Sequence, residues 1–155
     1  MSLEDRIQWF ENRSEKHPVL VKEIDSNVTA WASLSPWTNY GAYARTVEIS
    51  IFIAPEARGK GIGKEMIATI LDMGQNLNHR VFLARIIEGN EASVRLFKFF
   101  GFEQVSRMPD AGEKFGEKIT PIILQKKLLL RYLFQNLILF FILLRYKIFI
   151  FFILS

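Results

Sequence analysis

The sequence predicts a single mixed α/β or α+β domain, and three segments carry the prediction. Residues 46–53 alternate apolar and polar side chains, as a strand with one buried face does. Residues 62–71 carry apolar side chains at helical spacing directly after a glycine-rich loop. Residues 81–87 form a near-continuous apolar run, which is typical of a buried parallel strand. A strand, a helix and a second strand in this order predict a sheet covered by helices.

Local signals predict the remaining elements. Ser2 and Asp5 form a capping-box pattern at a helix start, and the turn residues 25–27 separate two runs of β-formers. The expected strands are 19–24, 28–34, 46–53, 81–87, 102–108 and 119–124, with a loop at 35–44. The expected helices run from Ser2 to about Lys16, from Ile62 to an end marked by Gly74 and Asn76, and from Asn90 to Gly101.

The composition limits the classes of protein. The 155 residues are 50% hydrophobic and 23% charged, which suits one folded domain. The absence of cysteine excludes disulfides and thiolate catalysis. The two histidines, His17 and His79, lie far apart in the sequence, so we expect no metal site. The N-terminus lacks the apolar core of a secretory signal, so we expect a cytoplasmic protein.

The basic character of the chain belongs to its C-terminal end. Five cations and no acid follow residue 125, so the net charge of +4 becomes −1 for residues 1–125. We therefore expect no nucleic-acid partner.

We expect a domain at 1–127 and a hydrophobic tail at 128–155. The tail holds 20 Leu, Ile or Phe among 28 residues, and Arg145 and Lys147 interrupt its apolar stretch. Charges are costly at a bilayer centre. We therefore favour sequence read out of frame over the two alternatives, a membrane or interfacial anchor and an aggregation-prone strand former.

Three glycines alternate with other residues in the loop before the second helix, and they suggest an anion site. Arg58 stands where a Walker loop needs glycine, and Lys64 or Met66 stands where a dinucleotide-binding fingerprint needs it. Free amides at a helix start still favour a phosphate or diphosphate. The alternative is a tight connection that needs glycine only for its dihedral angles.

The segments TVEISIFIAPEARGKGIGKEM and EGNEASVRLFKFFGF resemble the two signature segments of the GNAT acyl-coenzyme A N-acetyltransferases. HPVLV and RMPDAGEKFG make the chain similar to the phosphinothricin and methionine sulfoximine acetyltransferase branch. The resemblance covers about residues 3–127. It implies a mixed, mostly antiparallel central sheet with splayed central strands and flanking helices. It also implies acetyl transfer from acetyl-CoA to the amino group of a small amino acid or analogue, without a covalent enzyme intermediate.

The resemblance implies a role for each site residue. Glu48 would take the proton of the acceptor ammonium, and a backbone amide near Ile51 would donate to the thioester oxygen. Without the resemblance, Glu48 is interpreted as a solvated strand residue and Asn90 as a helix cap. The expected coenzyme-binding residues are Ile51, Phe52, Ile53, Arg58, Gly59, Lys60, Gly61, Ile62, Gly63, Lys64, Asn90 and Ser93. The expected acceptor-binding residues are Thr38, Asn39, Tyr40, Glu48, Ile49 and Ser50.

Some features depart from the family pattern. Phe97 stands where many members have Tyr or His, so we interpret it as core or as a wall of the coenzyme groove. Residues 117–120 replace an Arg-Trp-Leu-Asp run. We expect the chain to lack the strand and helix that precede Ser2 in the family. The alternatives are therefore a coenzyme-binding protein without catalysis and a membrane-associated interaction protein led by the tail. The resemblance further implies a homodimer.

Overall fold

The structure is a computed structural model that describes residues 2–128. The expected hydrophobic tail falls on residues that lie outside this range, apart from Leu128. Within the described range, no helix is both long and apolar enough to span a bilayer.

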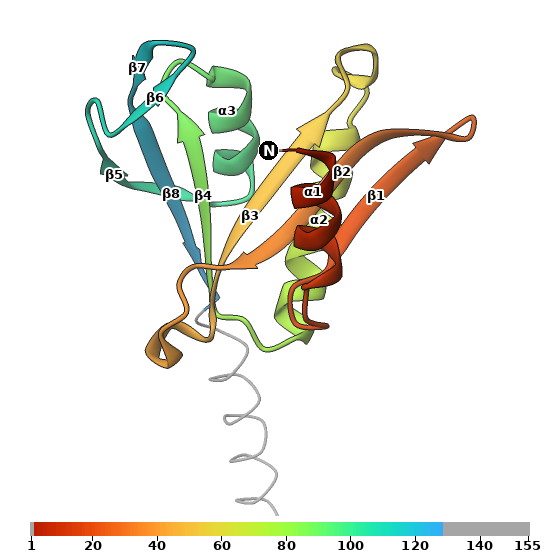
Figure 1. Cartoon of the computed structure of the whole chain (residues 1–155), viewed down its shortest axis with the longest axis horizontal. Coiled ribbons are helices and arrows are strands. Elements are labelled where there is room, and N and C mark those ends of the chain that lie inside the picture. Colours follow the sequence, from red (N-terminus) through yellow and green to blue (C-terminus); the bar gives the residue numbers. More distant parts are fainter. Residues whose placement is uncertain (1, 129–155) are drawn as a thin grey trace, which may run out of the picture.

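A six-stranded sheet in the order β1-β2-β3-β4-β8-β5 forms the centre of the fold (Figure 1). Every neighbouring pair is antiparallel except β3 and β4, which are parallel. This arrangement confirms the mixed, mostly antiparallel sheet. The strands are β1 (Val19–Ile24), β2 (Asn27–Pro36), β3 (Thr46–Ile53), β4 (Val81–Ile87), β5 (Glu103–Arg107), β6 (Gly112–Lys114), β7 (Glu117–Ile119) and β8 (Pro121–Lys127).

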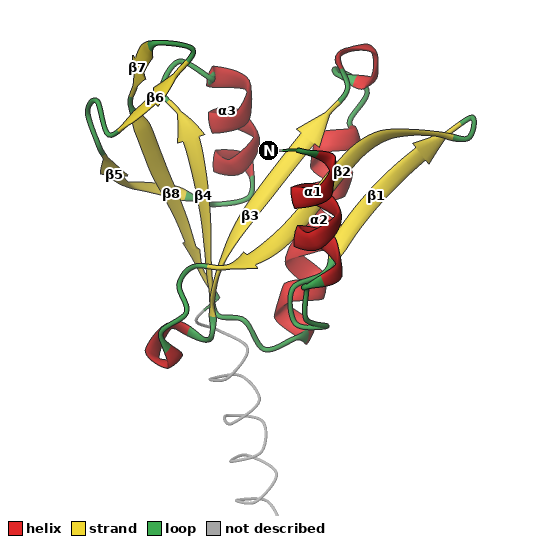
Figure 2. Ribbon diagram, viewed as in Figure 1, coloured by secondary structure: helices red, strands yellow, loops and turns green. Residues whose placement is uncertain are grey.

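Three α-helices flank this sheet in the described chain, with α1 and α2 over the half that contains β1 to β3 and α3 beside β4 (Figure 2). The helices are α1 (Leu3–Glu11), α2 (Ile62–Asn76) and α3 (Glu91–Phe99), with short 3₁₀ turns η1 (Gly41–Tyr43) and η2 (Pro55–Ala57). The apolar face of α2 is buried against β2 and β3, and it supplies much of the core.

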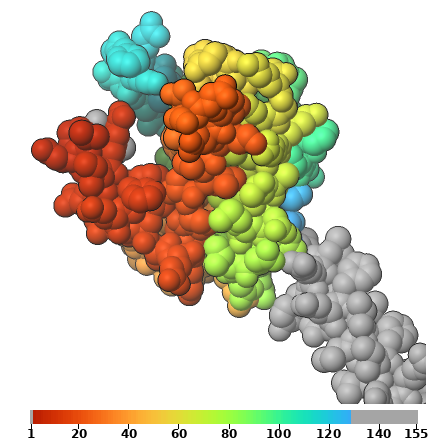
Figure 3. Space-filling model, turned by 90° about the vertical axis from the view of Figure 1, so that its right-hand side faces the viewer, coloured from red at the N-terminus to blue at the C-terminus, as the bar shows by residue number. Residues whose placement is uncertain are grey.

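The first helix ends at Glu11, five residues earlier than expected. Its capping box is confirmed: the amide of Asp5 donates to Ser2 Oγ at 3.1 Å, and the amide of Ser2 donates to Asp5 Oδ2 at 2.7 Å. Beyond the helix, the guanidinium of Arg13 donates to the backbone carbonyls of His17 and Leu34, which ties this segment to β2. The helix buries no residue, and Figure 3 shows its red segment on the outside of the molecule beside the β1 edge.

The expected strand at 119–124 is split in two. β6 and β7 form a separate short hairpin, and Phe115 and Gly116 turn between them with positive φ. β8 then starts at Pro121 and pairs with both β4 and β5. Three-residue strands carry too little alternation to be recognised in a sequence.

α2 ends at Asn76, as predicted, but Gly74, the other expected end signal, does not end it. It is buried inside the helix, and a Cβ atom there would lie 2.5 Å from Phe82 Cε1 and 2.9 Å from Leu34 Cδ1. The glycine is therefore the point at which α2 closely approaches the sheet.

The two histidines lie together, although they are far apart in the sequence. Their ring centroids are 5.5 Å apart, and His79 Nε2 lies 2.7 Å from the carbonyl oxygen of Lys16. Burial lowers the pKa of His17, with smaller contributions from His79, Arg13 and Lys16. Within the described chain, no group of three or more His, Cys, Asp or Glu side chains is placed to hold a metal ion.

We expect Gly74→Ala to lower the free energy of unfolding by about 1–3 kcal/mol, because the added methyl overpacks Phe82. This loss should exceed the roughly 1 kcal/mol that alanine gains in helix propensity. Gly41→Ala is the control, since its Cβ would meet nothing within 4 Å. Denaturant titration measures both variants, and equal stability of the two would contradict the packing role.

We expect the free energy of unfolding to fall as the pH is lowered through the pKa of His17. Its folded pKa is below the usual 6.5, so the unfolded chain binds the proton more readily. The free energy of unfolding is then greatest above about pH 7 and declines toward about pH 5. His17→Gln should flatten this decline in urea titrations at several pH values, and an unchanged slope would contradict the assignment.

Candidate active site

The parallel strands β3 and β4 separate after only three paired positions. Thr46 pairs with Val81, and the last pair joins Glu48 to Leu83. Figure 2 shows the two arrows diverging from this point. β3 remains paired with β2 as far as Ile53, and β4 remains paired with β8 as far as Ile87. The facing edges therefore present backbone groups without a strand partner, and buried groups of this kind need one.

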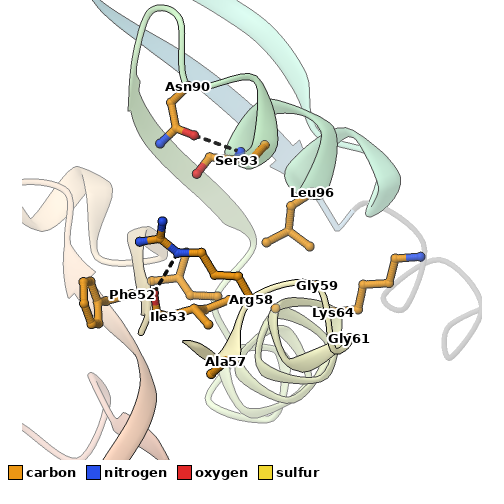
Figure 4. Close-up of a pocket in the computed structure, with 13 residues that line it drawn as sticks. Phe52, Ile53, Ala57, Arg58, Gly59, Gly61, Lys64, Asn90, Ser93 and Leu96 are labelled. Carbon is orange, nitrogen blue, oxygen red and sulfur yellow. Dashed lines mark hydrogen bonds between the residues drawn. The ribbon is translucent and has the colours of Figure 1, made fainter. Parts of the chain in front are cut away.

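A pocket of about 640 Å³ lies beyond this point of separation, lined by the end of β3, the glycine loop with the start of α2, and residues of and just before α3 (Figure 4). A volume of this size is typical of sites for small molecules and cofactors. Ten of the twelve expected coenzyme-binding residues line it; Lys60 and Ile62 do not. Ile62 is 6% exposed and belongs to the core. The lining residues are Ile51, Phe52, Ile53, Ala57, Arg58, Gly59, Gly61, Gly63, Lys64, Asn90, Ala92, Ser93 and Leu96.

The glycine loop forms one wall of the pocket and presents unpaired amides. Gly59 and Gly61 have φ of +73° and +83°, in the left-handed region that favours glycine. No turn or cap hydrogen bond in the described chain is donated by an amide between Gly59 and Gly63; the first donor is Lys64, whose amide bonds to the Gly61 oxygen at 3.0 Å. These amides lie at the positive end of α2, so the loop suits an anion.

The third glycine serves a different purpose. A Cβ atom on Gly63 would lie 3.0 Å from Ile53 Cδ1 and 3.1 Å from Leu96 Cδ2. Glycine at this position lets α2 start close to both β3 and α3. The tight-connection alternative is thus correct in part, because the glycines shape the turn and also leave its amides free.

The cations around the loop are spread over its two sides. Arg58 Nε donates to the carbonyl of Ile53 at 3.1 Å, which ties the loop to the end of β3 (Figure 4). Lys64 Nζ lies 4.0 Å from the centroid of the Phe99 ring. The carboxylate of Glu65 forms an ion pair with Lys22, with Oε1 at 2.8 Å from Nζ. The charge that remains near the free amides is therefore positive.

Asn90 and Ser93 stand across the pocket from the loop (Figure 4). Asn90 Oδ1 accepts the amide of Ser93 at 3.2 Å, so the expected helix cap is confirmed. The side-chain nitrogen Nδ2 of Asn90 has no partner among the described hydrogen bonds, and it can donate to a ligand. Leu96 was not anticipated from the sequence, although it stands one turn after Ser93 on the same helix face.

Glu48 lies where the two strands part. Its side chain is 22% exposed, and Oε2 lies 3.0 Å from Nη2 of Arg85 on β4. The sequence did not reveal this partner. The one sequence feature that could have suggested this ion pair is Arg85 itself, a single charged residue inside the apolar run of β4.

The other expected acceptor-binding residues differ in how accessible they are to a ligand. Ser50 shares the face of Glu48, whereas Ile49 is 3% exposed and its side chain belongs to the core. Thr38 to Tyr40 lie before β3 and do not line the pocket; Tyr40 is 77% exposed. Phe97 is buried against Phe102, which confirms its interpretation as a core residue.

Comparison with known proteins agrees with this geometry. The model of the acetyltransferase (GNAT) family matches residues 1–102. An L-amino acid N-acyltransferase of Escherichia coli is 34% identical over 81% of this chain and 73% of its own length. An L-methionine sulfoximine/L-methionine sulfone acetyltransferase of Salmonella typhimurium is 33% identical over 81% of this chain and 74% of its own length.

Solved structures show the same fold. A phosphinothricin acetyltransferase from Sinorhizobium meliloti, solved with acetyl-CoA, has a TM-score of 0.76 and 29% identity over 82% of this chain and 70% of its own. A ribosomal-protein-alanine N-acetyltransferase from Brucella melitensis has a TM-score of 0.78 and 35% identity over 83% of this chain and 80% of its own. The chain is therefore an acetyltransferase and belongs to the GNAT family.

Proposed function

We propose that the chain transfers an acetyl group from acetyl-CoA to the amino group of a small amino acid of the methionine sulfoximine, methionine sulfone or phosphinothricin type. The observation that carries the proposal is the pocket beyond the point at which β3 and β4 separate, which has a loop of free amides on one wall. Glu48 lies where the two strands separate and does not line this pocket. The relatives that act on such amino acids support the choice of acceptor.

The pocket residues fit coenzyme A in two respects. The free amides from Gly59 to Gly63 and the side chain of Arg58 would hold its diphosphate. The backbone groups that Ile51 and Ile53 turn toward the gap, apart from the Ile53 carbonyl that Arg58 holds, and the side-chain Nδ2 of Asn90 would hold its pantetheine arm, as a neighbouring strand would be held. When bound, acetyl-CoA supplies the acetyl thioester.

Glu48 has the chemistry that the acceptor requires. An amino acid arrives as an ammonium ion and must lose a proton before its lone pair can attack a carbonyl carbon. A carboxylate at the start of the gap can attract that ammonium and accept its proton directly or through water. A backbone amide near Ile51 would donate to the carbonyl oxygen as negative charge develops there. Holding both reactants in one pocket supplies a further part of the acceleration.

We expect Gly61→Ala to weaken acetyl-CoA binding by roughly tenfold, because a side chain at φ +83° displaces the amides that hold the diphosphate. Gly116→Ala is a matched control: its φ is +80°, its Cβ would also meet nothing within 4 Å, and it lies in the β6–β7 turn.

Both substitutions should cost about 1–2 kcal/mol of stability through backbone strain. Calorimetric titration with acetyl-CoA should separate them, since only the loop variant loses affinity. Equal affinities of the two variants would remove the loop from the binding site.

We expect Glu48→Gln to lower kcat by about 10²- to 10⁴-fold, the usual contribution of a general base, and to leave the Kd of acetyl-CoA unchanged. Thiol release with L-methionine sulfone as acceptor measures the first quantity, and titration measures the second. Glu88→Gln is the control, because Glu88 also pairs with an arginine, Arg107, at 2.6 Å. Turnover that survives in Glu48→Gln would remove Glu48 from the mechanism.

A further inference from the structure

We propose that Arg85 binds the α-carboxylate of the acceptor while Glu48 binds its ammonium, so that the site selects amines with a free carboxylate on the same carbon. The inference rests on the proposed function, because it assigns a specificity role to a residue of that same site.

Arg85 lies on β4, just beyond the point at which β3 and β4 separate, and like Glu48 it stands outside the lining of the coenzyme pocket. It is the one charged residue of β4, and its neighbours Ala84 and Ile86 are buried on the opposite face. The last β3–β4 pair joins Glu48 to Leu83, and Arg85 follows two residues later, on the same face as Leu83. Arg85 is therefore the first charged side chain beyond the point at which the strands part.

Arg85 and Glu48 form a pair of opposite charges that matches the two charges of an amino acid. Their charged atoms lie 3.0 Å apart, and the side chains are 49% and 22% exposed, so both can be reached by a solute. An amino acid carries an ammonium and a carboxylate on one carbon. It can replace the internal ion pair with two new pairs, ammonium to Glu48 and carboxylate to Arg85, without leaving either charge unpaired.

The guanidinium of Arg85 has N–H donors that remain available for a ligand. Among the described hydrogen bonds it makes one, to Glu48, and a guanidinium carries five N–H donors. Two parallel donors match the two oxygens of a carboxylate, which gives Arg85 the geometry for bidentate binding.

Trp37 supports the guanidinium from the side. The Cζ atom of Arg85 lies 5.5 Å from the centroid of the Trp37 ring, within the range of a cation–π contact. Trp37 is held in turn, because its backbone amide donates to the carbonyl of Thr46 at 3.2 Å. The contact limits the freedom of the Arg85 side chain, so that less order must be imposed when a ligand binds.

Acceptors without a carboxylate lack this compensation. A simple amine or a peptide N-terminus brings one positive charge to Glu48 and breaks its pair with Arg85. Arg85 is then left beside a second cation with no anion of its own. The arrangement discriminates against such acceptors by leaving a charge unpaired, as well as by favouring amino acids.

The test measures binding without turnover. The full chain is saturated with coenzyme A, which carries no acetyl group, and is titrated with L-methionine sulfone or with its α-carboxamide. We expect the free acid to bind roughly 10- to 100-fold more tightly than the amide, as a charged hydrogen-bonded pair contributes.

Arg85→Gln should abolish this preference by lowering the affinity for the free acid and not the affinity for the amide. Arg85→Lys should restore part of the preference. Arg107→Gln is the matched control, since it breaks a comparable Arg–Glu pair, that of Arg107 on the edge strand β5 with Glu88, and should leave the preference unchanged.

Three results would overturn the inference: wild-type chain that binds acid and amide equally, wild-type chain that binds neither, and Arg85→Gln that weakens both ligands equally. The last would mean that Arg85 only positions Glu48. The wild-type comparison needs no variant to fold. An Arg85-dependent preference in a chain that transfers no acetyl group would overturn the proposed function and leave this inference standing.

Discussion

The structure depends on one interruption of backbone pairing. All other neighbouring strands of the sheet are antiparallel, whereas β3 and β4 run parallel. They stop pairing after Glu48 and Leu83. Each strand is secured on its outer side, so the gap does not close by rearrangement. The two facing edges carry backbone donors and acceptors without a strand partner, which water or an extended ligand can satisfy. The gap that weakens the sheet is thereby the feature that creates a site.

The packing of α2 against the sheet positions the glycine loop relative to the open edge of β3. α2 approaches the sheet closely at Gly74 and begins close to Ile53 and Leu96 at Gly63. The contact at Gly63 fixes the start of the helix relative to the end of β3, and the contact at Gly74 fixes its last turn against β2 and β4. The free amides and the open strand edge therefore face one pocket. A ligand with an anionic group and an extended amide arm can then use both at once, and Glu48, the proposed base, lies where the strands separate.

Local patterns predicted the parts of the fold and site that depend on local sequence. The bounds of β3 and β4 were predicted to the residue, because alternation and apolar runs are strong signals. Features set by contacts distant in sequence could not be predicted: the pair of Arg85 with Glu48, and the closeness of His17 to His79. Gly74 was misjudged because a glycine that ends a helix and a glycine that packs inside one look alike in a sequence.

The most direct test of the account is to follow the backbone amides of the folded chain by ¹H–¹⁵N NMR while coenzyme A is added. We expect the largest shifts on the glycine loop between Gly59 and Gly63 and on the open edge of β3 at Ile51 and Ile53, because these amides gain hydrogen-bond partners. A folded chain that takes up no coenzyme A, or one whose shifts lie outside both segments, would contradict it.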